Sequence, residues 1–254
     1  MKTVVFSNQK GGVGKTTSAS ALAAGLTSRG YRVVAVDLDP QCNFCLSSGV
    51  DMLTVSRTLY DVFKGSADVT DVIVSGLGYD IIPGGLTLAA ADMDFTQAGR
   101  EYMLREALEA VSDRYDYAIV DTPPTLGILT TNALTAADGV IIPLTADVYA
   151  LQGLSQLNGL ILNVRKYCNH DLKIYGILLT KYNERQNVSK ALRDQIDAAA
   201  AKIGTRVYRS AIRESVAVRE AQLLQSDFLK EAPNANAAID YEAFIDEFIK
   251  GVSV

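Results

Sequence analysis

Short apolar runs bounded by turn residues alternate along this chain with segments of helical periodicity. The apolar runs are rich in β-branched residues and hydrophobic at consecutive positions, which is typical of parallel strands buried on both faces. We predict strands over residues 3–8, 32–37, 79–83, 116–121, 139–144 and 173–180, with a weaker one near 205–208. The helical patterns cover residues 16–29, 87–94, 100–114, 126–136, 151–167, 188–202 and 237–250.

This alternation predicts an α/β fold with a doubly wound, mostly parallel sheet flanked by helices. The chain has 254 residues and is 48% hydrophobic, which suits a single domain over residues 1–254. Because the first strand is expected at residue 3, we expect no N-terminal helix-turn-helix domain. Sheets of this kind bind ligands beyond the carboxyl ends of their strands, where the chemistry is therefore expected.

Composition narrows the functional class only slightly. The formal net charge is −5, three cysteines are present, and no apolar run approaches the roughly 20 residues that span a bilayer. The N-terminus shows no signal-peptide pattern. We therefore expect a cytoplasmic protein without a membrane partner.

The most informative segment is Lys-Gly-Gly-Val-Gly-Lys-Thr-Thr, which lies between the first predicted strand and the first predicted helix. Glycines let backbone N–H groups surround a phosphate, and the helix N-terminus adds its positive dipole end. A lysine reaching the β- and γ-phosphates and a threonine hydroxyl on Mg²⁺ complete such a loop. The predicted nucleotide-binding residues are Lys10, Gly11, Gly12, Val13, Gly14, Lys15, Thr16 and Thr17. The usual pattern has glycine where Gln9 stands, and this loop carries a second lysine, Lys10.

Acidic residues follow two further predicted strands. Asp37 and Asp39 come after one strand, and Asp121 ends another. Such acids often only cap the next turn or helix. Three of them near a phosphate loop instead indicate a site for Mg²⁺ and its water shell.

These segments together resemble the ParA/Soj partition proteins, of the MinD/ParA superfamily of P-loop ATPases with a deviant Walker A motif. The matching motifs are Lys-Gly-Gly-Val-Gly-Lys-Thr-Thr, Asp-Leu-Asp-Pro-Gln and Asp-Thr-Pro-Pro. The resemblance implies that Lys10 reaches the partner subunit's ATP and that Asp39 positions the attacking water. The catalytic residues that it implies are Lys10, Lys15 and Asp39. The implied metal site consists of Thr16, Asp37, Asp39 and Asp121. The implied switch, which responds to the γ-phosphate, consists of Asp121, Thr122, Pro123 and Pro124.

The resemblance further implies a slow, Mg²⁺-dependent ATP hydrolase that moves plasmid or chromosomal DNA. ATP would close a sandwich homodimer that binds DNA non-specifically on the nucleoid, and a ParB-like centromere-binding partner would stimulate hydrolysis and release. Three positions depart from the family pattern. Cys42 replaces a usual glycine, and Arg213 and Ser215 stand where Pro and Asn usually lie against the adenine.

A basic band lies in the last third of this acidic chain. Residues 181–219 hold nine basic and four acidic side chains, a net charge of +5. Such a band can be a solvated charged face or a surface for phosphate backbones. With the family resemblance, the predicted DNA contacts are Lys181, Arg185, Lys190, Arg193 and Arg219. Arg185 matches the family's DNA-contact arginine, whereas Glu214 is acidic where many relatives are basic.

The alternative is a MinD-like, nucleotide-gated membrane-positioning ATPase. Its C-terminal helix would need basic residues opposite an apolar stripe. Here the stripe Tyr241, Phe244, Ile245, Phe248 and Ile249 lies opposite acidic residues, so we expect it to pack on the protein. Cys42, Cys45, Cys168 and His170 could supply zinc ligands, but buried thiols are the simpler reading.

Overall fold

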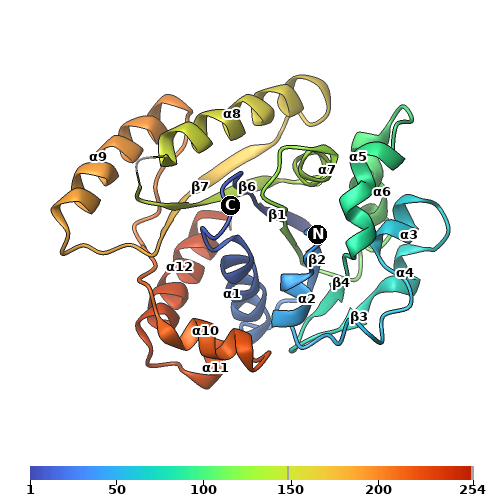
Figure 1. Cartoon of the computed structure of the whole chain (residues 1–254), viewed down its shortest axis with the longest axis horizontal. Helices are drawn as coiled ribbons and strands as arrows, with labels where there is room; N and C mark the ends of the chain where they lie inside the picture. Colours follow the sequence, from blue (N-terminus) through green and yellow to red (C-terminus); the bar gives the residue numbers. More distant parts are fainter. Residues whose placement is uncertain (148, 253–254) are drawn as a thin grey trace.

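One seven-stranded sheet runs through the middle of the protein (Figure 1), in a computed structural model that describes residues 1–147 and 149–252. The strands are β1 (Lys2–Phe6), β2 (Val33–Asp37), β3 (Val74–Ser75), β4 (Asp80–Ile82), β5 (Tyr117–Asp121), β6 (Gly139–Thr145) and β7 (Lys173–Thr180). Their order is β3-β4-β2-β5-β1-β6-β7. Every neighbouring pair is parallel except β3 with β4, so the predicted fold class is confirmed.

Helices cover both faces of this sheet (Figure 1). One layer contains α1 (Lys15–Ser28), α2 (Asn43–Ser47), α10 (Val216–Leu223), α11 (Phe228–Glu231) and α12 (Asn236–Val252). The other contains α3 (Leu59–Phe63), α4 (Val69–Val72), α5 (Ala91–Asp94), α6 (Met103–Glu109), α7 (Ile128–Ala136), α8 (Ala150–Tyr167) and α9 (Asn187–Lys202). Two 3₁₀ turns, η1 (Leu86–Ala90) and η2 (Arg100–Tyr102), precede α5 and α6.

Strand β2 shows why the central strands are apolar on both sides. Its successive residues alternate between the two hydrophobic cores: Val34 and Val36 pack under α3–α9, and Val33 and Ala35 pack under α1 and α12. All five residues of β2 are buried, as are all five of β5. Each of these strands ends in an aspartate, so the polar groups appear where the apolar run stops.

Helix α12 closes one layer by packing against α1. Tyr241, Phe244, Ile245 and Phe248 are each at most 2% exposed, which confirms the prediction that this stripe packs on the protein. A side chain at Gly25 of α1 would lie 2.3 Å from the end of Ile245, so the glycine permits the close approach of the two helices. Among the described residues, no helix has both the length and the apolar character needed to cross a membrane.

The structure differs from the sequence prediction in several short elements. Residues 205–208 form no strand, because only Val207 bridges β7, at Ile177. The expected helices at 87–94 and 100–114 begin as 3₁₀ turns, and the second ends at Glu109. Elements of two to eight residues such as β3, α2 and α10 show too few periods for the hydrophobic pattern to reveal them.

Candidate functional site

The glycine-rich loop connects β1 to α1, beyond the carboxyl ends of the parallel strands. Gly12 and Gly14 have φ angles of +72° and +82°, in the left-handed region that glycine adopts without strain. Within the described part of the chain, no amide N–H of residues 11–14 donates to a protein acceptor. A curved loop with unused N–H groups at a helix N-terminus is suited to bind a phosphate.

Lys15 lies at the base of this loop and is only 7% exposed. Its ammonium donates a 3.3 Å hydrogen bond to the Lys10 carbonyl. Burial lowers the pKa of Lys15, while the charges of Asp121 and Asp39 oppose that shift. The lysine is therefore held beside the acidic cluster, where an incoming polyanion would stabilise its charge.

Asp37 and Asp121 lie side by side at the ends of β2 and β5, directly opposite one another in the parallel register. Both are completely buried. Oδ2 of Asp121 accepts a 2.6 Å hydrogen bond from the Thr16 hydroxyl, whereas its Oδ1 is buried without a partner among the described groups. Burial, and then the nearby Asp37, raise the pKa of Asp121 well above its usual range.

This arrangement fits a hard cation. A buried carboxylate with one free oxygen and a threonine hydroxyl bound to its other oxygen supply oxygen ligands of the kind that Mg²⁺ prefers. A cation here would also offset the repulsion that raises the pKa of Asp121.

The oxygens of Asp37 are already used by the protein. Oδ1 accepts from the Asp39 amide at 3.1 Å and Oδ2 from the Cys45 amide at 2.9 Å. Burial raises the pKa of Asp37 to about 6. Asp37 therefore holds the segment after β2, and it is Asp39, 9% exposed, that lines the cavity.

The backbone conformation at Cys42 is one that glycine adopts without strain, which accounts for the usual glycine at this position. Its φ is +54°, so a residue with a side chain stands in the left-handed region. Cys42 and Cys45 are both buried, and burial raises the pKa of each thiol, that of Cys42 to about 11. Their thiols are consequently protonated core groups.

The segment after β5 is anchored at its start. Thr122 is fully buried, and its hydroxyl donates a 2.9 Å hydrogen bond to the carbonyl of Phe6 in β1. Pro123 is also buried, whereas Pro124 is exposed and lines the same cavity as the loop. The segment thus leads from the buried Asp121 to the cavity wall within three residues.

The cavity beside the loop has a volume of about 860 Å³ and continues to α10. Arg213 and Ser215, which stand where the family has its adenine contacts, both line this cavity. However, the Arg213 guanidinium is held by Asp240 of α12 through hydrogen bonds of 2.9 and 2.7 Å. No local pattern in the sequence indicates this ion pair, because Arg213 and Asp240 are 27 positions apart.

Lys10 has an ionic partner within its own chain. Its ammonium lies 2.5 Å from Oδ2 of Asp147, after β6, and both side chains are partly exposed. Asp147 also accepts a hydrogen bond from the Thr145 hydroxyl. Sequence reasoning missed Asp147, since nothing in the local pattern links residues 137 positions apart.

The basic band divides into groups with different surroundings. Arg185 and Lys190 are exposed and have no ionic partner among the described residues. Arg193 lies 3.8 Å from Asp197 and stacks over the Tyr182 ring. Arg219 pairs with Glu214 at 2.7 Å on the rim of the nucleotide cavity, and Lys181 bonds to the glycine-rich loop. The five predicted DNA contacts therefore differ in how far their charged groups are engaged within the chain.

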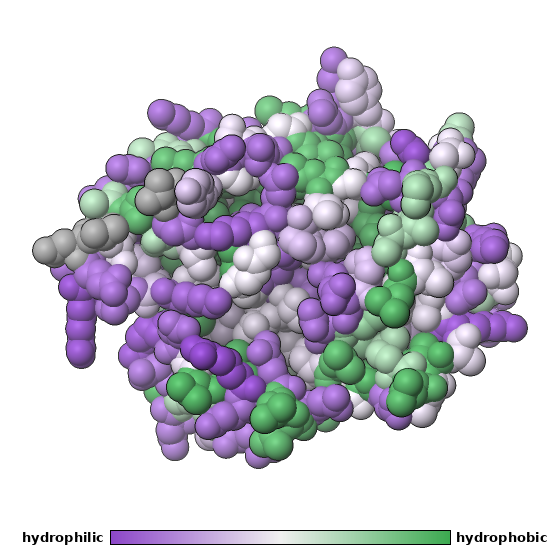
Figure 2. All heavy atoms as spheres, viewed as in Figure 1, coloured by the Kyte–Doolittle hydropathy of each residue, from purple (hydrophilic) through white to green (hydrophobic). Residues whose placement is uncertain are grey.

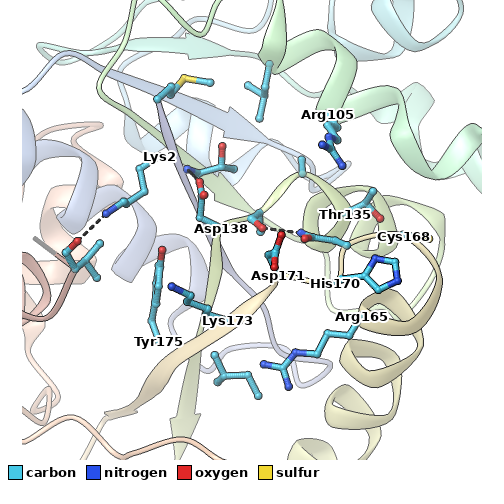
Figure 3. A pocket seen from close by; sticks show the side chains of 18 of the residues that line it. Lys2, Arg105, Thr135, Asp138, Arg165, Cys168, His170, Asp171, Lys173 and Tyr175 are labelled. Atoms are coloured by element: carbon cyan, nitrogen blue, oxygen red, sulfur yellow. Dashed lines mark hydrogen bonds between the residues drawn. The ribbon is translucent and has the colours of Figure 1, made fainter. Parts of the chain in front are cut away.

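A larger cavity, of about 1110 Å³, lies where β1, β6 and β7 begin, at the opposite ends of these strands from the glycine-rich loop. Figure 3 shows its lining side chains. Several of its polar groups hold neighbouring segments of the chain together. Lys2 donates to the Val252 carbonyl at 2.6 Å and Arg165 to that of Leu172 at 2.7 Å. It lacks the glycine-rich loop and the acidic cluster, so the candidate site is the smaller cavity.

Comparison with known proteins agrees with this geometry. A family model described as an AAA domain matches residues 1–174. The chain is 39% identical over 248 residues to the sporulation initiation inhibitor protein Soj of Bacillus subtilis, covering 96% of each chain. It is 40% identical over 226 residues to the chromosome partitioning protein ParA of Caulobacter vibrioides, covering 87% of this chain and 84% of the relative.

The fold also matches a solved structure that contains nucleotide. The cobyrinic acid a,c-diamide synthase of Mycobacterium smegmatis, with bound ATP analogue and magnesium, superposes with a TM-score of 0.84 and 33% identity. The match covers 97% of this chain and 93% of that one. With the loop, the paired strand-end acids and relatives of nearly equal length, the chain belongs to the Soj/ParA family of P-loop ATPases.

Proposed function

We propose that this protein is a Mg²⁺-dependent ATPase that partitions DNA through a nucleotide-dependent homodimer. The observation that carries the proposal is the meeting, at one edge of the sheet, of unused loop amides, the buried Lys15 and the free oxygen of Asp121 beside Thr16. These groups suit a triphosphate and its metal ion.

Each residue has a defined part in this reaction. The loop amides and Lys15 bind the β- and γ-phosphates, and Asp39, at the cavity wall, orients the attacking water. Thr16 and Asp121 would hold Mg²⁺, which would supply positive charge beside the phosphates, and Asp37 fixes the segment that carries Asp39. The segment 121–124 would sense the γ-phosphate, because it leads from Asp121, beside Thr16, to Pro124 in the cavity wall.

Lys10 links hydrolysis to dimerisation. In the single chain its ammonium is paired with Asp147. In a dimer closed over nucleotide, Lys10 leaves Asp147 and binds the phosphate held by the partner subunit. Both contacts join the positive ammonium to a negatively charged oxygen. Hydrolysis removes that phosphate charge and so releases the dimer.

Exposed apolar side chains lie on and just after α10, the helix that lines one side of the nucleotide cavity, as an interface between two copies requires. Val216, Leu223 and Leu224 of α10 and its end are 63%, 84% and 72% exposed. In Figure 2 hydrophobic side chains lie along the lower edge of the face drawn, which includes the region of α10 and α11, and others lie at its right side and near its top. Covering the side chains on and just after α10 stabilises the closed dimer by burying apolar surface.

Trapping the dimer tests the enzymatic part. The Asp39→Ala protein, incubated with ATP and Mg²⁺, should elute as a stable dimer in size-exclusion chromatography and release no phosphate. The Lys10→Ala protein should remain monomeric with ATP. A strictly monomeric Asp39→Ala protein at high concentration would refute the sandwich dimer.

DNA retention tests the partition part. Arg185 and Lys190, which have no ionic partner among the described residues, form the proposed DNA surface with Arg193 on α9. Arg185→Glu should abolish ATP-dependent retention of non-specific DNA, whereas the matched Lys64→Glu change beyond α3, on another exposed lysine, should not. Equal retention by the two variants would exclude this surface. A ParB-like partner should then accelerate hydrolysis on the nucleoid.

A further inference from the structure

The end of β7 holds the glycine-rich loop from outside. The Thr180 hydroxyl donates a 2.8 Å hydrogen bond to the carbonyl of Val13, and the Lys181 ammonium donates one of 2.8 Å to the carbonyl of Gly12. Thr180 is 2% exposed and Lys181 is at the surface. Both residues also line the nucleotide cavity.

These two bonds fix the direction of two peptide groups. In a trans peptide the C=O and the following N–H point in opposite directions. Holding the carbonyls of Gly12 and Val13 toward β7 therefore turns the N–H groups of Val13 and Gly14 the other way. Those N–H groups are among the loop amides that have no acceptor in the described part of the chain.

The backbone of Lys181 supports a functional use of its side chain. Its φ is +50°, in the left-handed region that costs a residue with a Cβ roughly 1 kcal/mol. Such a conformation persists where the surroundings require it, often at binding sites. In this protein the left-handed conformation of Lys181 occurs together with the hydrogen bond from its ammonium to the carbonyl of Gly12.

We infer that Lys181 is a positioning residue of the nucleotide site, which, with Thr180, orients the loop amides for phosphate before nucleotide arrives. This assignment rests on the proposed nucleotide binding and removes Lys181 from the DNA surface. Fixing the amides in advance lowers the conformational cost of binding and so strengthens nucleotide affinity.

The test measures ADP binding by isothermal titration, because ADP requires neither hydrolysis nor dimerisation. Lys181→Met keeps the aliphatic stem and removes the donor, so its Kd for Mg²⁺-ADP should rise about three- to tenfold, the worth of one hydrogen bond. Lys181→Arg should restore most of the affinity. The matched control is Lys64→Met, at an exposed position just after α3, which should bind ADP like the wild type.

The other half of the clamp gives an independent variant. Thr180→Val removes the second donor and should also raise the Kd, whereas Thr180→Ser should not. The fitted stoichiometry separates weaker binding from a fraction of unfolded protein. Wild-type protein that fails to bind ADP would refute the proposed function itself. Wild-type binding with an unchanged Kd in both Lys181→Met and Thr180→Val would overturn the present inference alone.

Discussion

The buried Asp37 should make the nucleotide-free protein less stable as the pH rises. Its pKa is raised from 3.8 to about 6 in the folded chain, because burial disfavours the carboxylate. Between these two values the folded state keeps a proton that the unfolded state has lost. The contribution of Asp37 is therefore fully favourable below about pH 4 and is lost as the pH rises through 6.

The magnitude follows from the size of the shift. At about 1.4 kcal/mol per pH unit, the ionised Asp37 costs the fold about 3 kcal/mol at high pH. Titration of this one group should raise the free energy of unfolding by about 2 kcal/mol between about pH 8 and pH 4.5. Other acids titrate in the same range, so the effect must be isolated with a variant.

The Asp37→Asn variant isolates the contribution of Asp37 to the pH dependence of stability, because an amide does not titrate. The amide cannot accept both the Asp39 and the Cys45 N–H bonds, so the variant carries a destabilisation that is independent of pH. What matters is the difference between the two stability curves, measured by urea unfolding without nucleotide or metal. That difference should change by about 2 kcal/mol across the range, while the exposed Asp194→Asn variant follows the wild type. Parallel curves for wild type and Asp37→Asn would refute the reasoning.

Three further predictions follow from local geometry. Gln225 has a φ of +49° just after α10, with Ser226 N–H bonded to Ala221; Gln225→Gly should stabilise the protein by about 0.5–1 kcal/mol in urea unfolding. A Cβ at Gly84 would lie 2.5 Å from the Asp37 carbonyl, so Gly84→Ala should cost about 1–3 kcal/mol and weaken ADP binding; an unchanged unfolding midpoint would contradict this. Asp147→Asn, which frees Lys10 from a half-exposed pair, should tighten the ATP dimer by up to about fivefold in analytical ultracentrifugation, and a weaker dimer would count against Asp147 as its competitor.

The sequence determined six of the seven described strands, their buried character and the acids at the ends of β2 and β5. A continuous apolar run such as residues 33–36 needs no tertiary contact to be recognised, because a strand buried on both faces is hydrophobic throughout. The spacing of the loop glycines likewise reports a local backbone requirement, the left-handed φ of Gly12 and Gly14. These features therefore follow from short segments read alone.

Only the tertiary structure decided which charges are available. Three cations of the basic band are already bound within the chain. Arg213 pairs with Asp240, Arg219 pairs with Glu214, and Lys181 donates a hydrogen bond to the carbonyl of Gly12. The pairing of Lys10 with Asp147 is of the same kind. A charged side chain selects its partner through space over a few ångströms, so composition can count the cations but cannot tell which of them are already occupied.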